Sequence, residues 1–381
     1  MKIALVRFRP FARGGAETTL RYLLRGFVDR GHEVRVFGAG AGPQSAESSL
    51  PGARYVPVPV WGGKAARLLS FAVNCRKALR QADADVVLSL ERTLYQQVYR
   101  AGDGCHREWL RRREPFLSPL EKLGQRLRLF HRVMLYLELR VFTDPGLRLV
   151  IANSRQVREE IQHHYGVAPD KIRVIFNGLD RERYQPLAGP DREALARRLG
   201  APKGARVVLF VGSGFRRKGL VWLIEAFAGV SDPQAQLWVV GHDSSWRYPE
   251  LAARLGVGGR VKFWGSQADT APFYQAATVL ALPTIYDPCS NVVLEALGCG
   301  TPVITTAANG AAEFLTSGVN GTVIAQPDDV RALTQALEEF LELGQGYRTR
   351  EAAATAVAHL SWENTVQQSL EVLEEAVQET R

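Results

Sequence analysis

Short apolar runs alternate with longer amphipathic stretches along most of the chain. An apolar run at residues 2–8 is followed by an amphipathic stretch at 16–30, which Gly31 ends, and by a second apolar run at 33–37. This order predicts a strand, a helix and a second strand, which together form a βαβ unit. By the same pattern, further strands are expected at residues 85–90, 149–152, 207–211, 237–240, 261–264, 279–282 and 302–305.

A second series of this kind begins after Gly200, with helical patterns at residues 220–228, 248–255, 270–277 and 291–297. Strands rich in Val, Ile and Leu with helices between them indicate parallel sheets that are covered on both faces. The sequence therefore predicts an α/β protein with two doubly wound domains and a boundary near residues 166–171. Ligands of such sheets bind beyond the carboxyl ends of the strands, so the candidate residues are those that directly follow a strand.

The composition excludes several classes of protein. Of the 381 residues, 46% are hydrophobic and 23% are charged, as in an ordinary globular chain rather than a disordered or fibrous one. No run approaches the ~20 apolar residues of a spanning helix, and the start of the chain does not resemble a signal peptide. The four cysteines are widely spaced without a CxxC pair, so we expect neither a disulfide framework nor a structural zinc site, and a reducing cytoplasm fits.

The charge is unevenly distributed. Residues 1–190 hold 32 Lys and Arg against 18 Asp and Glu, whereas residues 191–381 hold 16 against 21, which leaves a net charge of +9. A basic first half indicates that one half of the protein faces a polyanion, which could be a nucleic acid, an anionic membrane or a phosphorylated substrate.

The first candidate motif is VGSGFRRKGL at residues 211–220, directly after a predicted strand. Gly212 allows a tight backbone turn, and the basic triplet that ends in Arg217 and Lys218 then lies near the start of a helix. Amide groups at a helix start attract anions, and adjacent cations would complete a phosphate clamp. The alternative is a solvated basic turn.

The second candidate motif occupies residues 284–306, TIYDPCSNVVLEALGCGTPVITT. Asp287 lies in the loop, Asn291 fits the start of a helix, and Glu295 lies within that helix among apolar residues. The amides of Asn291, Val292 and Val293 at the helix start could bind a phosphate. Asp287 could instead be a plain helix cap and Glu295 a surface residue, but a carboxylate on so apolar a helix usually has a partner.

This motif carries a resemblance to a known family. The spacing D-x7-E followed by AL-x-C-G-x-P-V-I-T resembles the E-x7-E signature of the family 4 retaining glycosyltransferases, with Asp287 where many members have Glu. Further ordered motifs fit the same family, namely Gly14-Gly15, ANS at 152–154, FNGLD at 176–180, FRRKG at 215–219, VVGHD at 239–243 and VKFWG at 261–265. Within the family the chain looks most like the lipopolysaccharide core glucosyltransferase I group, because GDGCH at 102–106 precedes a long basic aromatic helix.

The resemblance implies a GT-B fold of two Rossmann-like domains that face an interdomain cleft. Residues 1–168 with 362–381 would form the acceptor domain, and residues 169–361 the nucleotide-sugar domain. It also implies that Arg217 and Lys218 bind the diphosphate and act in catalysis, that Glu295 binds the ribose, and that Asp287 binds the donor sugar. Cations and a helix start can stabilise the departing diphosphate without a metal, so neither a metal nor another cofactor is expected.

Acceptor residues are expected in the first half. Gly14 and Gly15 allow close approach of the backbone to acceptor and donor, respectively, although tight helix packing is an equally simple role. Asp103 and His106 lie in a short glycine-rich loop from which they could reach an acceptor hydroxyl. The resemblance favours Asp103 as a catalytic residue, whereas His106 is the weaker candidate and could be structural. It also implies that the departing phosphate helps to deprotonate the acceptor.

Residues 103–142 hold nine Lys and Arg against five Asp and Glu, interleaved with aromatic and leucine residues. This mixture favours binding to an anionic membrane surface, although a helix packed on the first domain with a solvated basic face is an alternative. No nucleic-acid-binding module is recognised, so no nucleic-acid partner is expected.

The sequence thus predicts a metal-independent enzyme that moves glucose from UDP-glucose onto a heptose of the lipopolysaccharide inner core. Its acceptor would be a phosphorylated lipid or glycan, and its place would be the cytoplasm, peripherally on the inner face of the inner membrane. Another donor (GDP-mannose, UDP-GlcNAc or ADP-heptose) or another acceptor glycan is the enzymatic alternative. A basic protein that only binds membranes or nucleic acid is the alternative of a different class.

Overall fold

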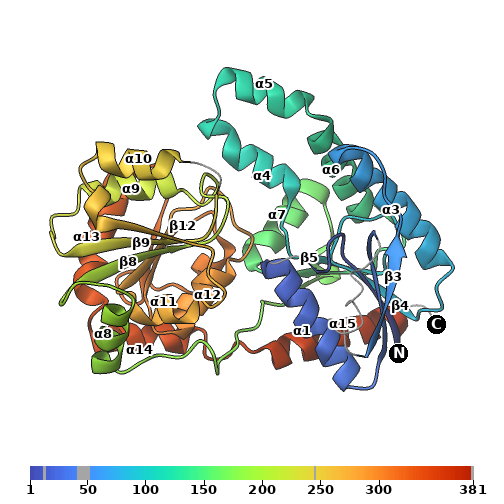
Figure 1. The fold of residues 1–381 in the computed structure, drawn as a ribbon. Coiled ribbons are helices and arrows are strands. Elements are labelled where there is room, and N and C mark those ends of the chain that lie inside the picture. Colours follow the sequence, from blue (N-terminus) through green and yellow to red (C-terminus); the bar gives the residue numbers. More distant parts are fainter. Residues whose placement is uncertain (12–13, 41–51, 244–245, 379–381) are drawn as a thin grey trace. The chain divides into compact units, whose positions relative to one another are not determined.

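The structure is a computed structural model that describes residues 1–11, 14–40, 52–243 and 246–378. The chain forms two compact units (Figure 1). Unit 1 comprises Met1–Gly178 and Trp362–Arg381, and unit 2 comprises Leu179–Ser361. The first boundary follows Gly178 rather than residue 168, because the intervening residues include a strand that pairs with unit 1.

In the described part of unit 1, seven parallel strands form a sheet in the order β3-β2-β1-β4-β5-β6-β7. The strands are β1 (Lys2–Val6), β2 (Glu33–Ala39), β3 (Ala53–Val58), β4 (Val86–Ser89), β5 (Val98–Ala101), β6 (Leu149–Ala152) and β7 (Ile172–Val174). The helices are α1 (Gly15–Asp29), α3 (Lys64–Arg80), α4 (His106–Arg113), α5 (Pro119–Leu127), α6 (Leu129–Phe142), α7 (Arg155–Tyr165) and α15 (Trp362–Gln378), with short 3-10 turns at Glu114–Phe116 and Pro169–Lys171.

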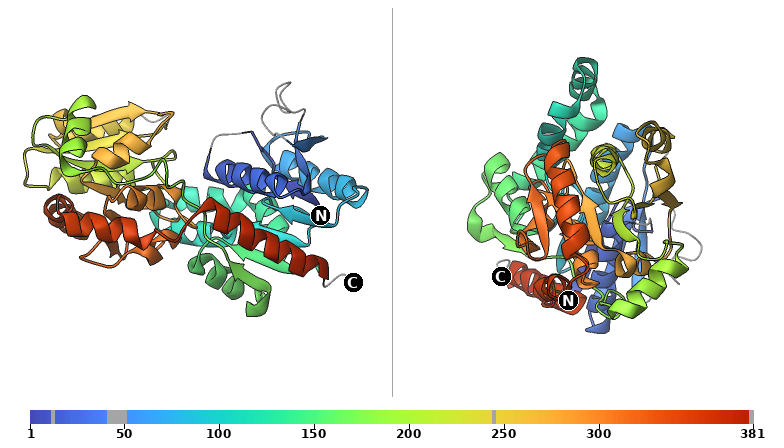
Figure 2. Two further views of the ribbon diagram at one scale, coloured as in Figure 1. Left: turned by 90° about the horizontal axis from the view of Figure 1, so that it is seen from below. Right: turned by 90° about the vertical axis from the view of Figure 1, so that its left-hand side faces the viewer.

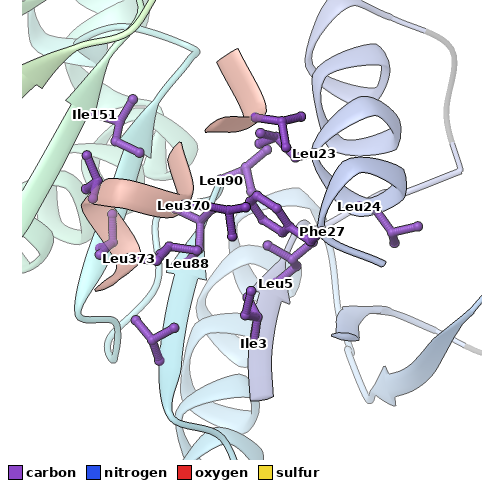
Figure 3. Packing of buried hydrophobic residues seen from close by; sticks show 14 of the residues in the cluster. Ile3, Leu5, Leu23, Leu24, Phe27, Leu88, Leu90, Ile151, Leu370 and Leu373 are labelled. Atoms are coloured by element: carbon purple, nitrogen blue, oxygen red, sulfur yellow. The ribbon is translucent and has the colours of Figure 1, made fainter. Parts of the chain in front are cut away.

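The core of unit 1 includes side chains from the last helix of the chain. Leu370 and Leu373 on α15 are buried together with Leu5 on β1, Phe27 on α1 and Leu88 on β4 (Figure 3). The ring of Trp362 stacks on Tyr22 of α1 with centroids 4.3 Å apart, and α15 lies beside α1 (Figure 2). Burial of these apolar faces accounts for the return of the chain end to unit 1.

In the described part of unit 2, six parallel strands are ordered β10-β9-β8-β11-β12-β13. The strands are β8 (Arg206–Val211), β9 (Ala235–Val240), β10 (Val261–Gly265), β11 (Val279–Leu282), β12 (Val303–Thr306) and β13 (Gly321–Ile324). The helices are α8 (Gly189–Arg198), α9 (Leu220–Ala228), α10 (Arg247–Arg254), α11 (Ala271–Ala276), α12 (Asn291–Gly298), α13 (Val330–Leu343) and α14 (Tyr347–Ala356), with 3-10 turns at Gly258–Arg260 and Gly310–Phe314. The prediction of two doubly wound parallel sheets is confirmed.

The prediction of a single long basic helix after residue 106 is wrong. The segment folds as three helices, α4, α5 and α6, rather than one (Figure 1). Pro115 is the second residue of the short turn after α4, and Pro119 occupies the first position of α5 behind a capping box formed by Ser118 and Glu121. Proline lacks the amide that a continuing helix needs, so each proline begins a new helical segment instead of extending the previous one.

Candidate active site

Both sheets reverse their strand order at one point, and candidate residues lie at both of these points. In unit 2 the reversal lies between β8 and β11, which are hydrogen-bonded neighbours. Arg217 and Lys218 follow β8, and Asp287 follows β11. A crevice opens beyond the carboxyl ends of parallel strands where the order reverses, and this crevice is the usual ligand site of such folds. The topology therefore brings the two predicted motifs of unit 2 together.

Glycines shape the turn that follows β8. Gly212 has a φ of 135°, and a Cβ there would lie 2.5 Å from Cε of Lys218. Gly241 has a φ of 137°, and its Cβ would lie 2.1 Å from the carbonyl oxygen of Gly212. Asp243 accepts a hydrogen bond from the Phe215 amide at 2.8 Å. Only glycine tolerates the positive φ of Gly212 and its close contact with Lys218, so Gly212 determines where the Lys218 side chain can lie.

Two cations meet one carboxylate at this turn. Nη1 of Arg217 lies 3.1 Å from Oδ2 of Asp287 and donates to the Tyr286 carbonyl at 2.8 Å, and Nζ of Lys218 lies 3.6 Å from the same Oδ2. The Lys218 side chain is only 8% exposed, whereas that of Arg217 is 36% exposed. Burial lowers the pKa of Lys218, and Asp287 offsets part of this effect. With one more positive than negative charge, the cluster can accept an anion.

The start of α12 lies directly after Asp287. Ser290 is its N-cap residue, but the Ser290 hydroxyl is buried and has no hydrogen-bond partner among the described residues. The backbone amide of Ser290 donates to Asn309 at 3.3 Å. Asn291 and Val292 are partly buried and Val293 is buried in the first turn. In this turn the Val293 amide donates to the Ser290 carbonyl at 3.0 Å, and the positive end of the helix dipole favours the predicted phosphate contact.

Glu295 lies one turn further along α12. The Tyr274 hydroxyl donates to its Oε2 at 2.8 Å. Burial raises the pKa of the Glu295 carboxyl above its usual value, and Tyr274, Arg183, Lys218 and Tyr184 offset only part of this effect. Glu295 is therefore a hydrogen-bonded carboxylate and not the surface residue of the alternative interpretation. Tyr274 and Tyr184 were not predicted from the sequence, because they lie 21 and more than 100 positions away from Glu295.

The reversal point of unit 1 holds a second charged cluster, centred on Arg7 after β1. Nη1 of Arg7 lies 2.9 Å from Oδ2 of Asp103 and 3.8 Å from Glu91, and Nη2 lies 3.0 Å from Glu17. Burial alone would lower the pKa of Arg7, but the three carboxylates outweigh burial and raise it. A Cβ on Gly14 would lie 2.6 Å from Oε2 of Glu17. The predicted residue Asp103 thus belongs to one cluster centred on Arg7, in which Gly14 lies beside Glu17, and the Asp103 side chain is 42% exposed.

His106 lies elsewhere in unit 1. It is the first residue of α4, is buried, and its Nε2 lies 3.1 Å from Nδ1 of His131 on α6. Burial, followed by the charge of Arg92, lowers the pKa of His106 to about 3, so the ring is neutral near pH 7. This placement gives His106 a packing role between α4 and α6, and a contact with an acceptor remains a prediction.

The helices α5 and α6 expose apolar side chains beside basic ones. Leu120, Leu123 and Leu127 on α5 are 83%, 55% and 68% exposed. Figure 1 shows α5 away from the sheet of unit 1. Exposed neighbours from the same segment are Arg126, Arg128, Leu129, Arg132, Tyr136 and Arg140. Among the residues that the structure describes, no helix is both long and apolar enough to cross a membrane.

No group of three or more metal-ligating side chains occurs within the described ranges. Asp83 and Asp85, which match a DxD spelling, instead contact the Lys2 side chain at 2.5 Å and the Lys2 amide at 2.7 Å. The four cysteines are buried and unbridged.

Comparison with known proteins gives consistent results along the chain. Residues 13–183 match the model of Glycosyltransferase Family 4, and residues 205–343 match that of the Glycosyl transferases group 1. The lipopolysaccharide glucosyltransferase WaaG of Escherichia coli (strain K12) is 28% identical over 350 residues, which are 90% of each chain.

Two solved structures extend these matches. The crystal structure of WaaG, described as a glycosyltransferase involved in lipopolysaccharide biosynthesis, has a TM-score of 0.82 at 25% identity, covering 97% of this chain and 99% of that one. The structure of Anabaena Alr3699/HepE in complex with UDP-glucose has a TM-score of 0.72 at 23% identity, covering 98% and 100%.

Proposed function

Because the chain belongs to family 4 of the glycosyltransferases and has the GT-B fold, we propose that it moves glucose from UDP-glucose onto a heptose of the lipopolysaccharide inner core. The similarity to WaaG over nine tenths of both chains supports this choice of reaction. HepE, which shares the fold, is described with UDP-glucose bound, so UDP-glucose is the first donor to test.

The observation that carries the proposal is the cluster of Arg217, Lys218 and Asp287 at the reversal point of unit 2. The two cations and the amides at the start of α12 would bind the diphosphate of the donor. As the bond between sugar and phosphate breaks, negative charge develops on the leaving diphosphate, and groups already oriented toward it lower the barrier. Lys218 and Arg217 would supply this charge without a metal ion.

The remaining donor contacts follow from the same arrangement. Glu295 would accept hydrogen bonds from the ribose hydroxyls. Asp287, which pairs with both cations in the structure, would exchange part of that pairing for hydroxyls of the glucose once the diphosphate neutralises the cations. Gly212, and Gly15 in unit 1, would let the backbone approach the donor closely.

On the acceptor side, Asp103 is the proposed contact for the reacting hydroxyl, and Gly14 would let the acceptor approach. Arg7 pairs with Asp103 and keeps a compensating charge beside it. The reaction would retain the configuration of the donor sugar, with an oxygen of the departing phosphate taking the proton of the acceptor hydroxyl. Such a step needs no separate side-chain base.

The direct test is mass-spectrometric detection of transfer from a panel of nucleotide sugars to delipidated core saccharides, in the presence of EDTA. We expect a hexose to be added from UDP-glucose. Replacement of Arg217 or Lys218 by Ala should slow transfer by about 10²–10³-fold, the usual effect of removing one group that stabilises developing charge. Wild-type rates in both variants would contradict the diphosphate assignment, and transfer from another donor alone would replace UDP-glucose.

We also propose that the surface of α5 and α6 binds the anionic inner face of the inner membrane, where a phosphorylated lipid acceptor would be found. An anionic membrane binds proteins through inserted apolar side chains and through charge. The exposed leucines on α5 would insert, and the neighbouring arginines would attract the anionic head groups. Flotation with phosphatidylcholine vesicles, with and without phosphatidylglycerol, tests the proposal. Wild type should float only with the anionic vesicles, and the triple change of Leu120, Leu123 and Leu127 to Ser should weaken flotation.

The change Leu255→Ser, at an exposed leucine of unit 2, is the matched control and should leave flotation unchanged. Equal binding of wild type to neutral and anionic vesicles would contradict the role of charge. Unchanged binding of the triple variant would contradict the role of α5.

A further inference from the structure

Two tyrosines from different elements meet the carboxylate of Glu295. Tyr274 on α11 is fully buried, and its hydroxyl donates to Oε2 of Glu295 at 2.8 Å. Tyr184, in the segment that begins unit 2, is 9% exposed and lies near the same carboxylate, where it lowers the pKa of Glu295. The two rings pack edge to face, with centroids 6.0 Å apart. Phenylalanine would fill the same volume, so the hydroxyls need an explanation beyond packing.

Both tyrosines are held firmly by their surroundings. The Thr301 hydroxyl donates to the Tyr274 carbonyl at 2.7 Å. The amide of Tyr184 donates to Asp180 at 2.9 Å, and the Arg183 guanidinium lies over the Tyr184 ring at 5.2 Å. Arg183 is in turn paired with Asp269 at 2.8 Å. Side chains that are fixed in this way can fix the group they contact, whereas a glutamate on a helix has several accessible rotamers.

The direction of the hydrogen bonds is also fixed. Burial and the nearby Glu295 raise the pKa of Tyr274 well above its usual value, so its hydroxyl stays protonated and can only donate to the carboxylate. A carboxylate offers about four acceptor positions, of which the Tyr274 hydroxyl occupies one and the nearby Tyr184 can take a second. The remaining positions can serve a pair of adjacent hydroxyl groups on a ligand.

We propose that Tyr274 and Tyr184 are positioning residues that hold the Glu295 carboxylate in one orientation, and that this orientation makes the donor site select ribose over 2′-deoxyribose. The inference rests on the proposed function, because it takes Glu295 as the ribose contact. A fixed, partly buried acceptor is left unpaired by a ligand that lacks the matching hydroxyl, and this loss produces strong discrimination. A mobile carboxylate could turn toward other partners and would discriminate less.

Titration calorimetry of the whole chain with UDP and with 2′-deoxy-UDP tests the inference. Wild type should bind UDP about tenfold more tightly, as expected for one hydrogen bond to a charged group. In Tyr274→Phe and Tyr184→Phe this ratio should fall toward one, mainly through weaker binding of UDP. The acid limb of UDP binding should also move to higher pH, because the tyrosine that favours ionised Glu295 is lost.

Tyr347→Phe is the matched control, since Tyr347 is exposed and donates to Glu351 at 3.2 Å on the surface of the same unit. It should keep the wild-type ratio. If wild type binds UDP and both buried variants keep its ratio and pH profile, the inference is wrong and the proposed function stands. If both variants lose UDP and 2′-deoxy-UDP equally, the tyrosines do not act through ribose selection. If wild type binds no UDP, the proposed function and the inference both fail.

Discussion

Glu138 in unit 1 and Glu295 in unit 2 are both helical carboxylates that contact a tyrosine hydroxyl. Glu138 is 1% exposed and pairs at 2.8 Å with Arg92, which is 4% exposed. It also accepts hydrogen bonds from Tyr165 and from the two backbone amides that begin α4. Glu295 has two tyrosines, but the described structure places no cation in contact with it; the nearby charges of Arg183 and Lys218 act at longer range.

The difference appears in the two pKa values. Burial raises the pKa of Glu138, but Arg92, Tyr165 and the α4 amides outweigh burial, so its pKa lies below the ordinary value. For Glu295 burial prevails and the pKa lies above the ordinary value. The first carboxylate is fully compensated within the protein, and the second keeps acceptor capacity that a ligand could use. Full compensation is typical of a structural group, whereas incomplete compensation is typical of a binding group.

The largest expected effect is on the structural carboxylate. Glu138→Gln leaves the Arg92 charge buried without its partner and weakens the cap of α4. Breaking a buried pair in this way destabilises a protein by about 3–5 kcal/mol. Chemical denaturation of wild type and variant measures the change in the free energy of unfolding. A loss below about 1 kcal/mol would contradict the view that Glu138 stabilises unit 1.

The corresponding change in unit 2, Glu295→Gln, should affect stability little and UDP binding strongly. Glu295→Gln removes a buried charge while its side-chain oxygen still accepts from Tyr274, so we expect unchanged or slightly higher stability, by up to about 1 kcal/mol. UDP affinity should fall by about 10–100-fold, since hydrogen bonds to the ribose lose their charged acceptor. Denaturation and calorimetry on the same preparation check both parts. A variant that binds UDP normally would remove Glu295 from the ribose site.

The pH dependence should separate the two groups further. Glu138 stabilises the fold above its ordinary pKa of 4.5, and this stabilisation is lost as pH falls through its lower folded value. Glu295 has a raised folded pKa, so its ionised form destabilises the fold, and acidification toward 4.5 relieves that effect. Denaturation between pH 4 and 8, with each Gln variant as reference, should give differences of opposite sign at neutral pH. Differences of the same sign would show that the comparison is incorrect.

The smallest effect on stability is expected at Asp269, an exposed carboxylate of unit 2. Asp269 pairs with Arg183 at 2.8 Å, but both side chains are about half exposed, at 59% and 43%. Asp269→Asn should change stability by no more than about 1 kcal/mol, because solvent screens exposed pairs. A loss comparable to that of Glu138→Gln, measured by the same denaturation, would mean that burial does not govern these pairs.

The sequence predicts the sheets well where strands are continuous apolar runs, as in β8 and β11. It misses the edge strands β3, β7 and β13, of which β3 contains Pro57 and β13 begins with Gly321, and it misses β5, whose run is interrupted by the buried Arg100. Strands at an edge or with an internal charge are specified by pairing and by neighbours from distant segments. Local patterning carries little of this information.

Local sequence patterns likewise predict only some residues of the candidate site. Glycine, cation and carboxylate spacing identifies Gly212, Lys218 and Asp287, because these residues follow strands in short segments. The contact between Arg7 and Asp103 spans 96 positions and depends on the strand order. Tyr274 and Tyr184 have no local signal at all, since a tyrosine in an apolar helix or a loop is an ordinary packing residue. Their relation to Glu295 emerges only from the folded chain.

A crystal structure of the chain grown with UDP in the absence of divalent metal tests the central claim most directly. We predict that the diphosphate lies within hydrogen-bond distance of Arg217 and Lys218, next to the first amides of α12, with the ribose hydroxyls on Glu295. A nucleotide bound away from these three side chains, or only in the presence of a metal ion, would contradict the account.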